Sequence, residues 1–431
     1  MRSGSASRHE RLLQLFERHA VSARTAGLTR VRVEDDRLEG DLLTIEGKRV
    51  VNFGSCAYLG LNLDPRLKAG AIEAIDKYGP VFSSSNAYTS LDLYTQLEER
   101  LSQVFAAHVV IPTTTTLGHL AALPVLIGDG DGVLVDSQAH STVHLGTQVL
   151  QAEGIIVDPL PHNNVTALRE AVEEATRTFE HVWYLADGVY SMFGDVAPVA
   201  AVYELLDEYP NLHVYFDDAH GFSWSGPSGR GYVLANRPLH PRMVVIVSLA
   251  KSFGSGGSAI AFADPEDAQR VQLCGGTLTF SGPLHPAELG AAVAAADIHL
   301  SAEIDELQDR LRRQIGLVRK AVVAAALPVV ALDSTPVWFI RVGGHAQTME
   351  LGRRMLDDGF YLNLASFPAV PAGQSGMRFT HTLYHSDDQI LAMIEALSRH
   401  LPALVGEPEV VIDLTALEAG VQAPGQGAQG G

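Results

Sequence analysis

The sequence predicts an α/β protein with a large, mostly parallel β-sheet domain and a smaller α+β domain after it. Three observations predict this fold. Apolar strand-like runs alternate with helical runs from about residue 50 to 285, the short strands after residue 325 lie among helices, and 431 residues exceed the usual size of one hydrophobic core. We expect four segments: an N-terminal helix and short β segment (1–50), the large domain (51–285), a long helix and the small domain (286–415), and a disordered tail (416–431).

The N-terminal and central elements follow from apolar periodicity. Residues 8–19 fit an amphipathic helix, and a short polar β segment continues to about residue 50. Four apolar runs then read as buried strands. They are "HVVIPT" before a helix at 116–127, "GVLVDS" before one at 141–152, "VWYLADG" before one at 198–208, and "LHVYFDDAH" before a Gly-rich loop.

The C-terminal third predicts a different arrangement. A single long helix is expected over 287–325, with Ile304, Leu311 and Val318 on its apolar stripe. Short strands are expected at "VVALDS", "VWFIRV", "GFYLNLAS" and "MRFTHT", with helices at 346–358 and 387–402. The end, "GVQAPGQGAQGG", has the low-complexity composition of a disordered segment.

Composition excludes several classes of function. A net charge of −19 argues against a nucleic-acid binder or a partner of anionic membranes, since both need basic surface. Cys56 and Cys274 are the only cysteines in the sequence, which favours a reducing cytoplasm. The charged start lacks the apolar core of a signal peptide, and no apolar stretch approaches the length of a membrane span. We therefore expect a soluble cytoplasmic protein.

Lys251 ends the stretch "VVIVSLAKSFGSGG", where a buried strand over Met243–Leu249 runs into small residues and glycines. A lysine extending out of a strand end is the simpler interpretation. The alternative is a Schiff-base lysine, with nearby hydroxyls and backbone amides holding a phosphate.

Other strand ends carry polar residues that a structural role alone does not require. Asp217 follows one apolar strand, with His220 three residues later, and a buried carboxylate needs a cationic or hydrogen-bonding partner. Asp136 and Asp187 end two more strands. The threonines of "IPTTTTLGHL" run from a strand into a helix, whose free N–H groups can bind an anion. His140 and His144 are spaced for a metal pair, but without a third ligand we expect no metal site.

Three motifs together carry a family resemblance. "LADGVYSMFGDVAPV", "FDDAHGFSWSGPSGRG" and "SLAKSFGSGG", in this order, resemble the α-oxoamine synthases, which are fold-type I pyridoxal-phosphate enzymes. "NFGSCAYLGL" and "FPAVPAGQSGMRFTHTLYH" are similar to the family's N- and C-terminal motifs, so the resemblance covers roughly residues 50–400. It implies the fold-type I (aspartate aminotransferase-like) fold and favours the Schiff-base interpretation of Lys251.

The resemblance also implies roles for individual residues. By position, Lys251 forms the Schiff base with pyridoxal 5'-phosphate, Asp217 bonds the pyridine nitrogen, and Arg378 binds the carboxylate of an amino acid. The remaining implied cofactor contacts are His140 on the ring face, His220 and Ser191 at the 3-hydroxyl, and Ser248, Thr115 and Thr116 at the phosphate.

The sequence departs from the family at positions that face substrate or a neighbouring subunit. The family's glycine-rich segment is here "VFSSSNAYTS" (81–90), and a threonine that would reach the neighbour's phosphate is replaced by Gly282. The other departures are Cys56 for asparagine, Thr116 for an aromatic residue, His119 for asparagine, and Ala250 for a hydroxyl residue. Ring contacts that match the family, in altered surroundings, favour the same cofactor chemistry on different substrates over a changed type of reaction.

The implied reaction condenses an amino acid with an acyl thioester, carried by coenzyme A or an acyl carrier protein, and releases carbon dioxide to leave an α-amino ketone. An aminotransferase on the same fold is the main alternative, and a non-catalytic protein of this fold is a third. We expect a homodimer with both active sites at the subunit interface, because "VFSSSNAYTS" and "TLTFSGPLHP" are poor in charge for surface segments.

Overall fold

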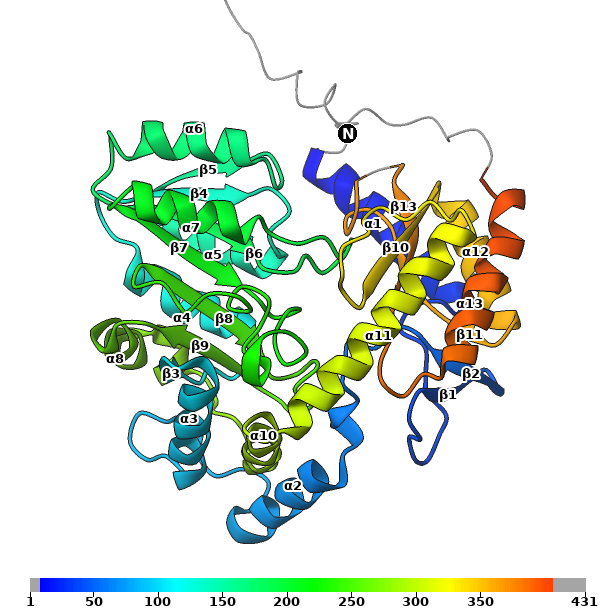
Figure 1. Ribbon diagram of the computed structural model, residues 1–431, viewed down its shortest axis with the longest axis horizontal. Helices are drawn as coiled ribbons and strands as arrows, with labels where there is room; N and C mark the ends of the chain where they lie inside the picture. Colours follow the sequence, from blue (N-terminus) through cyan, green and yellow to red (C-terminus); the bar gives the residue numbers. More distant parts are fainter. Residues whose placement is uncertain (1–7, 372, 406–431) are drawn as a thin grey trace, which may run out of the picture.

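The large sheet has seven strands in the order β3-β9-β8-β7-β6-β4-β5 (Figure 1). The computed structural model describes residues 8–371 and 373–405. Strands β8, β7, β6, β4 and β5 run parallel, whereas β9 runs antiparallel to its neighbours β8 and β3. The prediction of a mostly parallel sheet is confirmed. The strands are β3 (His108–Val110), β4 (Gly132–Asp136), β5 (Ile156–Leu160), β6 (Val182–Asp187), β7 (Leu212–Asp217), β8 (Met243–Ser248) and β9 (Ser258–Phe262).

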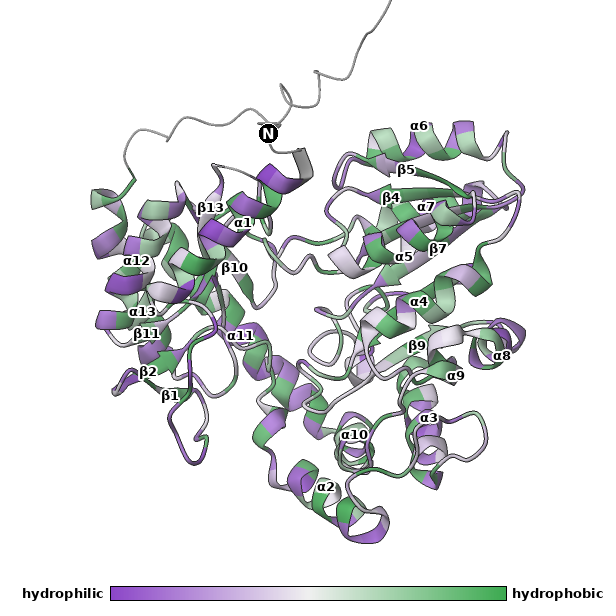
Figure 2. Ribbon diagram, turned by 180° about the vertical axis from the view of Figure 1, so that it is seen from behind, coloured by the Kyte–Doolittle hydropathy of each residue, from purple (hydrophilic) through white to green (hydrophobic). Residues whose placement is uncertain are grey.

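Both faces of this sheet are covered, which explains why its strands are apolar at nearly every position (Figure 2). In β7, Val214 and Phe216 pack on one face, and Tyr215 packs on the other. The first face is covered by α3 (Asp92–Phe105), α6 (Val165–Ala175), α7 (Val199–Glu208) and α10 (Pro286–His299). The second is covered by α4 (Thr115–Leu126), α5 (Ser141–Ala152) and α8 (Pro265–Cys274).

The rest of the chain forms two three-stranded sheets beside the large one. One has the order β10-β13-β12, and the other joins β1 and β2 from the N-terminal part to β11 near the C-terminal end. The strands are β1 (Leu42–Ile45), β2 (Lys48–Asn52), β10 (Val337–Gly343), β11 (Phe360–Tyr361), β12 (Asn363–Ala365) and β13 (Ser375–Thr380). The helices beside these sheets are α1 (Arg8–Thr25), α12 (His345–Asp357) and α13 (Asp387–His400). Two further helices are α2 (Pro65–Tyr78) and the short α9 (Gly276–Phe280).

The single helix expected over 287–325 is wrong. Two helices occupy this stretch, α10 and α11 (Glu303–Ala324), and α11 runs between the large sheet and the C-terminal strands (Figure 1). Ser301 separates them: its hydroxyl donates to the Ile298 carbonyl at 2.8 Å and accepts from the Glu303 N–H at 3.3 Å. A serine that bonds to the backbone on both sides ends one helix and starts the next.

Two of the C-terminal strand predictions also need correction. "VVALDS" forms no strand, because Val329 makes only an isolated bridge to Ile340. "GFYLNLAS" divides into β11 and β12, which belong to different sheets. The helices predicted at 346–358 and 387–402 are confirmed as α12 and α13, and the predicted tail at 416–431 lies outside the described residues.

No helix in the described part of the chain is long and apolar enough to cross a membrane.

Candidate active site

The candidate site begins where three neighbouring strands end. Asp187 ends β6, Asp217 ends β7 and Ser248 ends β8, and Asp187 and Asp217 are directly paired in the register of the sheet. All three side chains are buried. Parallel strands place their carboxyl ends at one edge of a sheet, which is where α/β proteins bind ligands.

Asp217 is held as a carboxylate. Its Oδ2 accepts a hydrogen bond from His119 Nε2 at 3.2 Å, and its Oδ1 accepts one from the Ala219 N–H at 3.0 Å. Burial alone would raise the pKa of Asp217, but the hydrogen bond and charge of His119, and then Lys251, lower it to about 2. A buried, ionised carboxylate at this position can hold a proton on a ring nitrogen.

Asp187, which pairs with Asp217 in the register, has a raised pKa and therefore favours the protonated form. Burial, and then the charge of Asp217, raise its pKa well above the ordinary value, although its Oδ1 accepts a hydrogen bond from the His140 N–H at 2.9 Å. Two carboxylates this close do not both ionise readily. The proton therefore stays on Asp187, and the negative charge stays on Asp217.

Lys251 follows β8 and is partly exposed beside these carboxyl groups. Burial lowers the pKa of its amine, against the opposing charges of Asp217, Cys56 and Asp187. An amine with a lowered pKa is more often neutral and therefore nucleophilic toward an aldehyde. Ser248, at the end of β8, accepts a hydrogen bond from the Ala250 N–H at 3.2 Å, which fixes the turn that leads to Lys251.

Two histidines line the site, and both favour the neutral form. His140 precedes α5, where its Nδ1 lies 2.7 Å from the Thr142 hydroxyl. His220 follows β7 and shares a hydrogen bond of 2.7 Å with the Tyr58 hydroxyl. Burial lowers the pKa of each, and nearby Lys251 lowers that of His220 further. At neutral pH they can act as hydrogen-bonding and stacking groups without adding charge.

Arg378 reaches this site from β13 in the C-terminal part of the chain. Its Nε donates to the Ser191 carbonyl at 2.6 Å, and its Nη2 lies 3.7 Å from Cys56 Sγ. The guanidinium is buried, so an anion bound there meets little competing solvent. The backbone of Ser191 thus lies beside the arginine that the sequence predicts to bind a carboxylate.

The loop that carries Ser191 is tied to the sheet by a histidine between two carboxylates. His162 Nδ1 lies 2.8 Å from Asp136 Oδ1, and its Nε2 lies 2.6 Å from Asp195 Oδ2. Burial would lower the pKa of His162, but the hydrogen bonds to Asp136 and Asp195 raise it to about 9. This protonated imidazole joins the end of β4 to the loop after β6.

Thr115 and Thr116 open helix α4, so their N–H groups are among those without an intrahelical acceptor. The hydroxyl that caps the helix belongs to Thr114, which accepts from the Leu117 N–H at 3.2 Å. The two predicted phosphate contacts therefore remain at a helix N-terminus, where an anion is favoured. Within the described residues no hydrogen bond joins Thr115 or Thr116 to Lys251 or Asp217, so their role at the phosphate remains a prediction.

Sequence reasoning missed what three residues do at this site. His119 was noted as a departure from the family, but its hydrogen bond to Asp217 joins residues on different elements, which no local pattern indicates. Tyr58 lies in the "NFGSCAYLGL" motif and bonds His220. The sequence marked Asp187 as a strand end, but it did not show that Asp187 pairs with Asp217 in the register, which together with burial raises the pKa of Asp187.

These residues fit pyridoxal phosphate. The neutral-prone amine of Lys251 suits its aldehyde, the ionised Asp217 suits its ring nitrogen, and the start of α4 suits its phosphate. Together these three groups are specific for pyridoxal phosphate, because each matches a different part of that molecule.

Comparisons with known proteins agree with this geometry. Residues 48–397 match the family described as aminotransferase class I and II. The chain is 32% identical over 365 residues to an 8-amino-7-oxononanoate synthase from Geobacter sulfurreducens, covering 84% of this chain and 91% of that protein. It is 29% identical to the synthase of that name from Coprothermobacter proteolyticus, covering 88% and 95%.

Among solved structures, a serine palmitoyltransferase from S. paucimobilis superposes with a TM-score of 0.81 at 21% identity, covering 93% of this chain and 99% of that one. This likeness concerns the fold, which is confirmed as the one that the resemblance implied. With the sequence relatives and the strand-end site, it places this chain in the aminotransferase class I and II family, as a member of the α-oxoamine synthases.

Proposed function

We propose that this protein is a pyridoxal-phosphate-dependent acyltransferase that condenses an amino acid with an acyl thioester and releases carbon dioxide, leaving an α-amino ketone. The observation that carries the proposal is the placement of Lys251, Asp217 and Arg378 around one site at the carboxyl edge of the sheet. The synthase names of the sequence relatives favour condensation over amino transfer.

Different residues of the protein would take different roles in this reaction. When bound, pyridoxal phosphate draws electrons from the α-carbon of the amino acid into its protonated ring. Asp217 would keep the proton on the ring nitrogen, and the Lys251 amine would hold the cofactor and move the proton at the α-carbon. His140, His220 and Ser191 would position the ring, and Thr115, Thr116 and Ser248 would bind the phosphate.

Arg378 would bind the carboxylate of the amino acid, because it is a buried guanidinium whose Nη2 lies 3.7 Å from Cys56 Sγ, near Lys251. For the acyl chain, a cavity of about 740 Å³ lies between α1 and the C-terminal strands. Ser141, the neighbour of His140, lines it together with apolar residues that include Phe16, Leu364 and Phe367. An apolar hollow that begins beside the site suits an acyl thioester.

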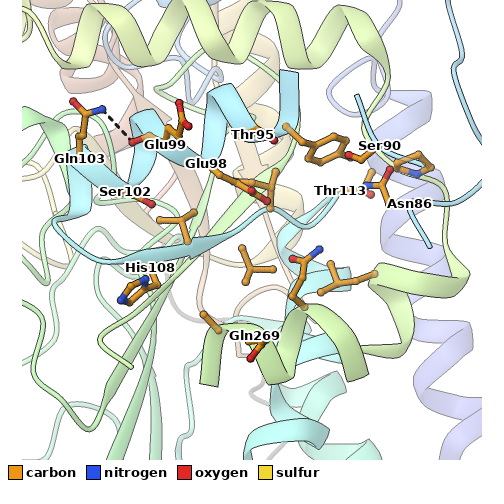
Figure 3. A pocket seen from close by; sticks show the side chains of 18 of the residues that line it. Asn86, Ser90, Thr95, Glu98, Glu99, Ser102, Gln103, His108, Thr113 and Gln269 are labelled. Atoms are coloured by element: carbon orange, nitrogen blue, oxygen red, sulfur yellow. Dashed lines mark hydrogen bonds between the residues drawn. The ribbon is translucent and has the colours of Figure 1, made fainter. Parts of the chain in front are cut away.

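We also propose a homodimer, in a cytoplasmic location. Two segments support it, residues 81–90 and residues 277–286, the second of which begins in α9. The Ser85 hydroxyl joins them by donating to the Thr279 carbonyl at 2.7 Å, and they expose Tyr88 (94%) and Phe280 (90%). They border a hollow of about 800 Å³, in which Figure 3 shows Asn86 and Ser90 near Thr113. Exposed aromatic rings around a hollow are typical of a surface that meets a partner. Light scattering should give about twice the chain mass, and a fully active monomer would contradict the dimer.

The function is tested by incubating the holoenzyme with single amino acids and either acyl-coenzyme A or acyl carrier protein donors. Mass spectrometry should find a decarboxylated α-amino ketone with at least one pair. A 2-oxo acid formed without thiol release would identify an aminotransferase instead. Neither product, with an intact bound cofactor, would contradict both enzymatic proposals.

A further inference from the structure

Cys56 lies where the proposed carboxylate site meets the reactive amine. Its Sγ is 3.7 Å from Arg378 Nη2, and the residue is only partly exposed. The backbone around it is fixed, because Thr380 in β13 donates to the Phe53 carbonyl at 2.8 Å through its N–H and to the Ser55 carbonyl through its hydroxyl. The thiol is therefore held against the guanidinium by β13 itself.

The charges around Cys56 favour the thiolate. Burial would raise its pKa, but the cations Arg378 and Lys251 have the larger combined effect and lower it, with a further contribution from Tyr58. A thiolate beside a cation is the reactive form of cysteine. The other cysteine, Cys274, is exposed at the end of α8 and lies in a different part of the fold.

We propose that Cys56 and Arg378 form a reactive anion site, in which the guanidinium binds the carboxylate of a small electrophile and the neighbouring sulfur bonds to its carbon. With an α-halocarboxylate, the C–S bond forms as the carbon–halogen bond breaks, and halide leaves. With an α,β-unsaturated carboxylate, sulfur bonds to the β-carbon and water supplies a proton to the α-carbon. Modification blocks the place of the amino-acid carboxylate.

This inference rests on the proposed role of Arg378 as a carboxylate site, but not on the condensation reaction. It predicts that Cys56 prefers a negatively charged alkylating reagent over a neutral one, which an ordinary exposed thiol does not. Iodoacetate and iodoacetamide deliver nearly isosteric groups, and only iodoacetate carries a charge for Arg378 to bind. The preference for iodoacetate at Cys56 should therefore exceed the preference at Cys274 by about tenfold or more, the effect of one charge-assisted contact.

The experiment treats the holoenzyme with each reagent and follows both cysteines by peptide mass mapping. Acetate should slow the labelling of Cys56 by iodoacetate, whereas acetamide, of the same shape but neutral, should not. Arg378→Met should remove the preference, and Arg341→Met, at an exposed arginine on the adjacent β10, should keep it. Cys56→Ser should leave labelling at Cys274 alone.

Equal reagent preferences at the two cysteines, or no protection by acetate, would overturn the proposal, and both are measured on the unaltered chain. These outcomes are independent of turnover. If labelling is selective but no amino ketone forms, the proposed function fails and the reactive anion site stands. If amino ketone forms but labelling is unselective, only the reactive anion site fails.

Discussion

The two sides of the candidate site are built differently. On the ring side, Asp187, Asp217 and Ser248 end adjacent strands and are buried, so their positions follow from the register of one sheet. On the substrate side, Cys56 and Gly282 lie in segments without regular structure. A one-residue slip in a strand would turn every side chain to the other face, whereas a loop accepts a new side chain locally.

This contrast explains where the sequence departs from the family. The departures at Cys56, Gly282 and 81–90 lie on the irregular side, and the strand-end residues match the motifs. Thr116, His119 and Ala250 are exceptions: Thr116 and His119 lie on α4, where His119 contacts Asp217, and Ala250 precedes Lys251. The protein thus combines a ring side of the family's type with its own substrate side.

The largest effect is expected at Lys251. Lys251→Ala should abolish turnover and leave the fold intact, because the residue follows β8 and makes no hydrogen bond that holds the sheet among the described residues. Borohydride reduction of the unaltered holoenzyme, followed by peptide mapping, should place the cofactor label on Lys251. A label on another lysine would contradict the assignment of the whole ring side.

Substitutions at Asp217 and Ser248, which end the neighbouring strands β7 and β8, should lower activity less than Lys251→Ala, and by different amounts. Asp217→Asn should cost more activity than Ser248→Ala at saturating cofactor, because it removes the charge that keeps the ring nitrogen protonated. Ser248→Ala removes one hydrogen bond to a charged phosphate, worth roughly 1–3 kcal/mol. Equal kcat values for the two variants would show that Asp217 has been assigned wrongly.

His162 allows a pH test of how firmly the Ser191 loop is joined to the sheet. Its pKa is raised from 6.5 to about 9 on folding, so its stabilisation is complete below pH 6.5 and is lost as the pH rises through about 9. His162→Gln should lower the free energy of unfolding by about 2 kcal/mol at pH 6, and the difference from the unaltered protein should shrink above pH 9.

The matched control is His181→Gln. His181 also pairs with an aspartate, Asp131 at 3.0 Å, but 45% of its side chain is exposed, so the pair contributes little. Chemical denaturation at several pH values measures both variants. A difference for His162→Gln that does not depend on pH would show that packing, and not the charge, accounts for the loss.

The smallest effect on stability is expected at Gly282. A Cβ there would meet no atom within 4 Å, and its backbone does not need glycine, so Gly282→Thr should change stability by less than about 0.5 kcal/mol. In the proposed dimer the new hydroxyl would reach the neighbour's phosphate and slow cofactor loss on dialysis. Gly276→Thr, at another open position, should not slow it. Identical cofactor loss from the two variants would contradict this placement of Gly282.

The sequence predicted the elements whose patterns are local. The apolar run Met243–Leu249 became β8, and the strand-end aspartates were found because a polar residue after a buried run is visible in one dimension. The β5–α6 unit was missed, since Ile156–Leu160 contains a proline and an aspartate and lies at the edge of the sheet. The break at Ser301 was missed although serine followed by acidic residues is a helix-start signal.

The candidate site was predictable only in part, for a related reason. Lys251, Asp217 and Arg378 could be assigned from motifs, but the 3.7 Å contact between Cys56 and Arg378 joins residues 322 positions apart. The same holds for Tyr58 and His220, which are 162 positions apart. Such contacts depend on how the C-terminal strands pack against the large sheet, and one sequence without the fold does not contain that information.

The attachment of the 53–58 segment to β13 has one more consequence. Leu383 donates to the Tyr58 carbonyl at 2.9 Å, and Thr380 bonds the Phe53 carbonyl, so Cys56 and Arg378 belong to the same body of the molecule. Lys251 follows β8 and belongs to the large-sheet part, so a substrate that contacts both Arg378 and Lys251 spans the seam, which is the boundary between these two parts. The distance between the carboxylate site and the amine therefore depends on how the two parts pack against each other. Substitutions along that seam, far from either end of the substrate, can change which amino acids the protein accepts.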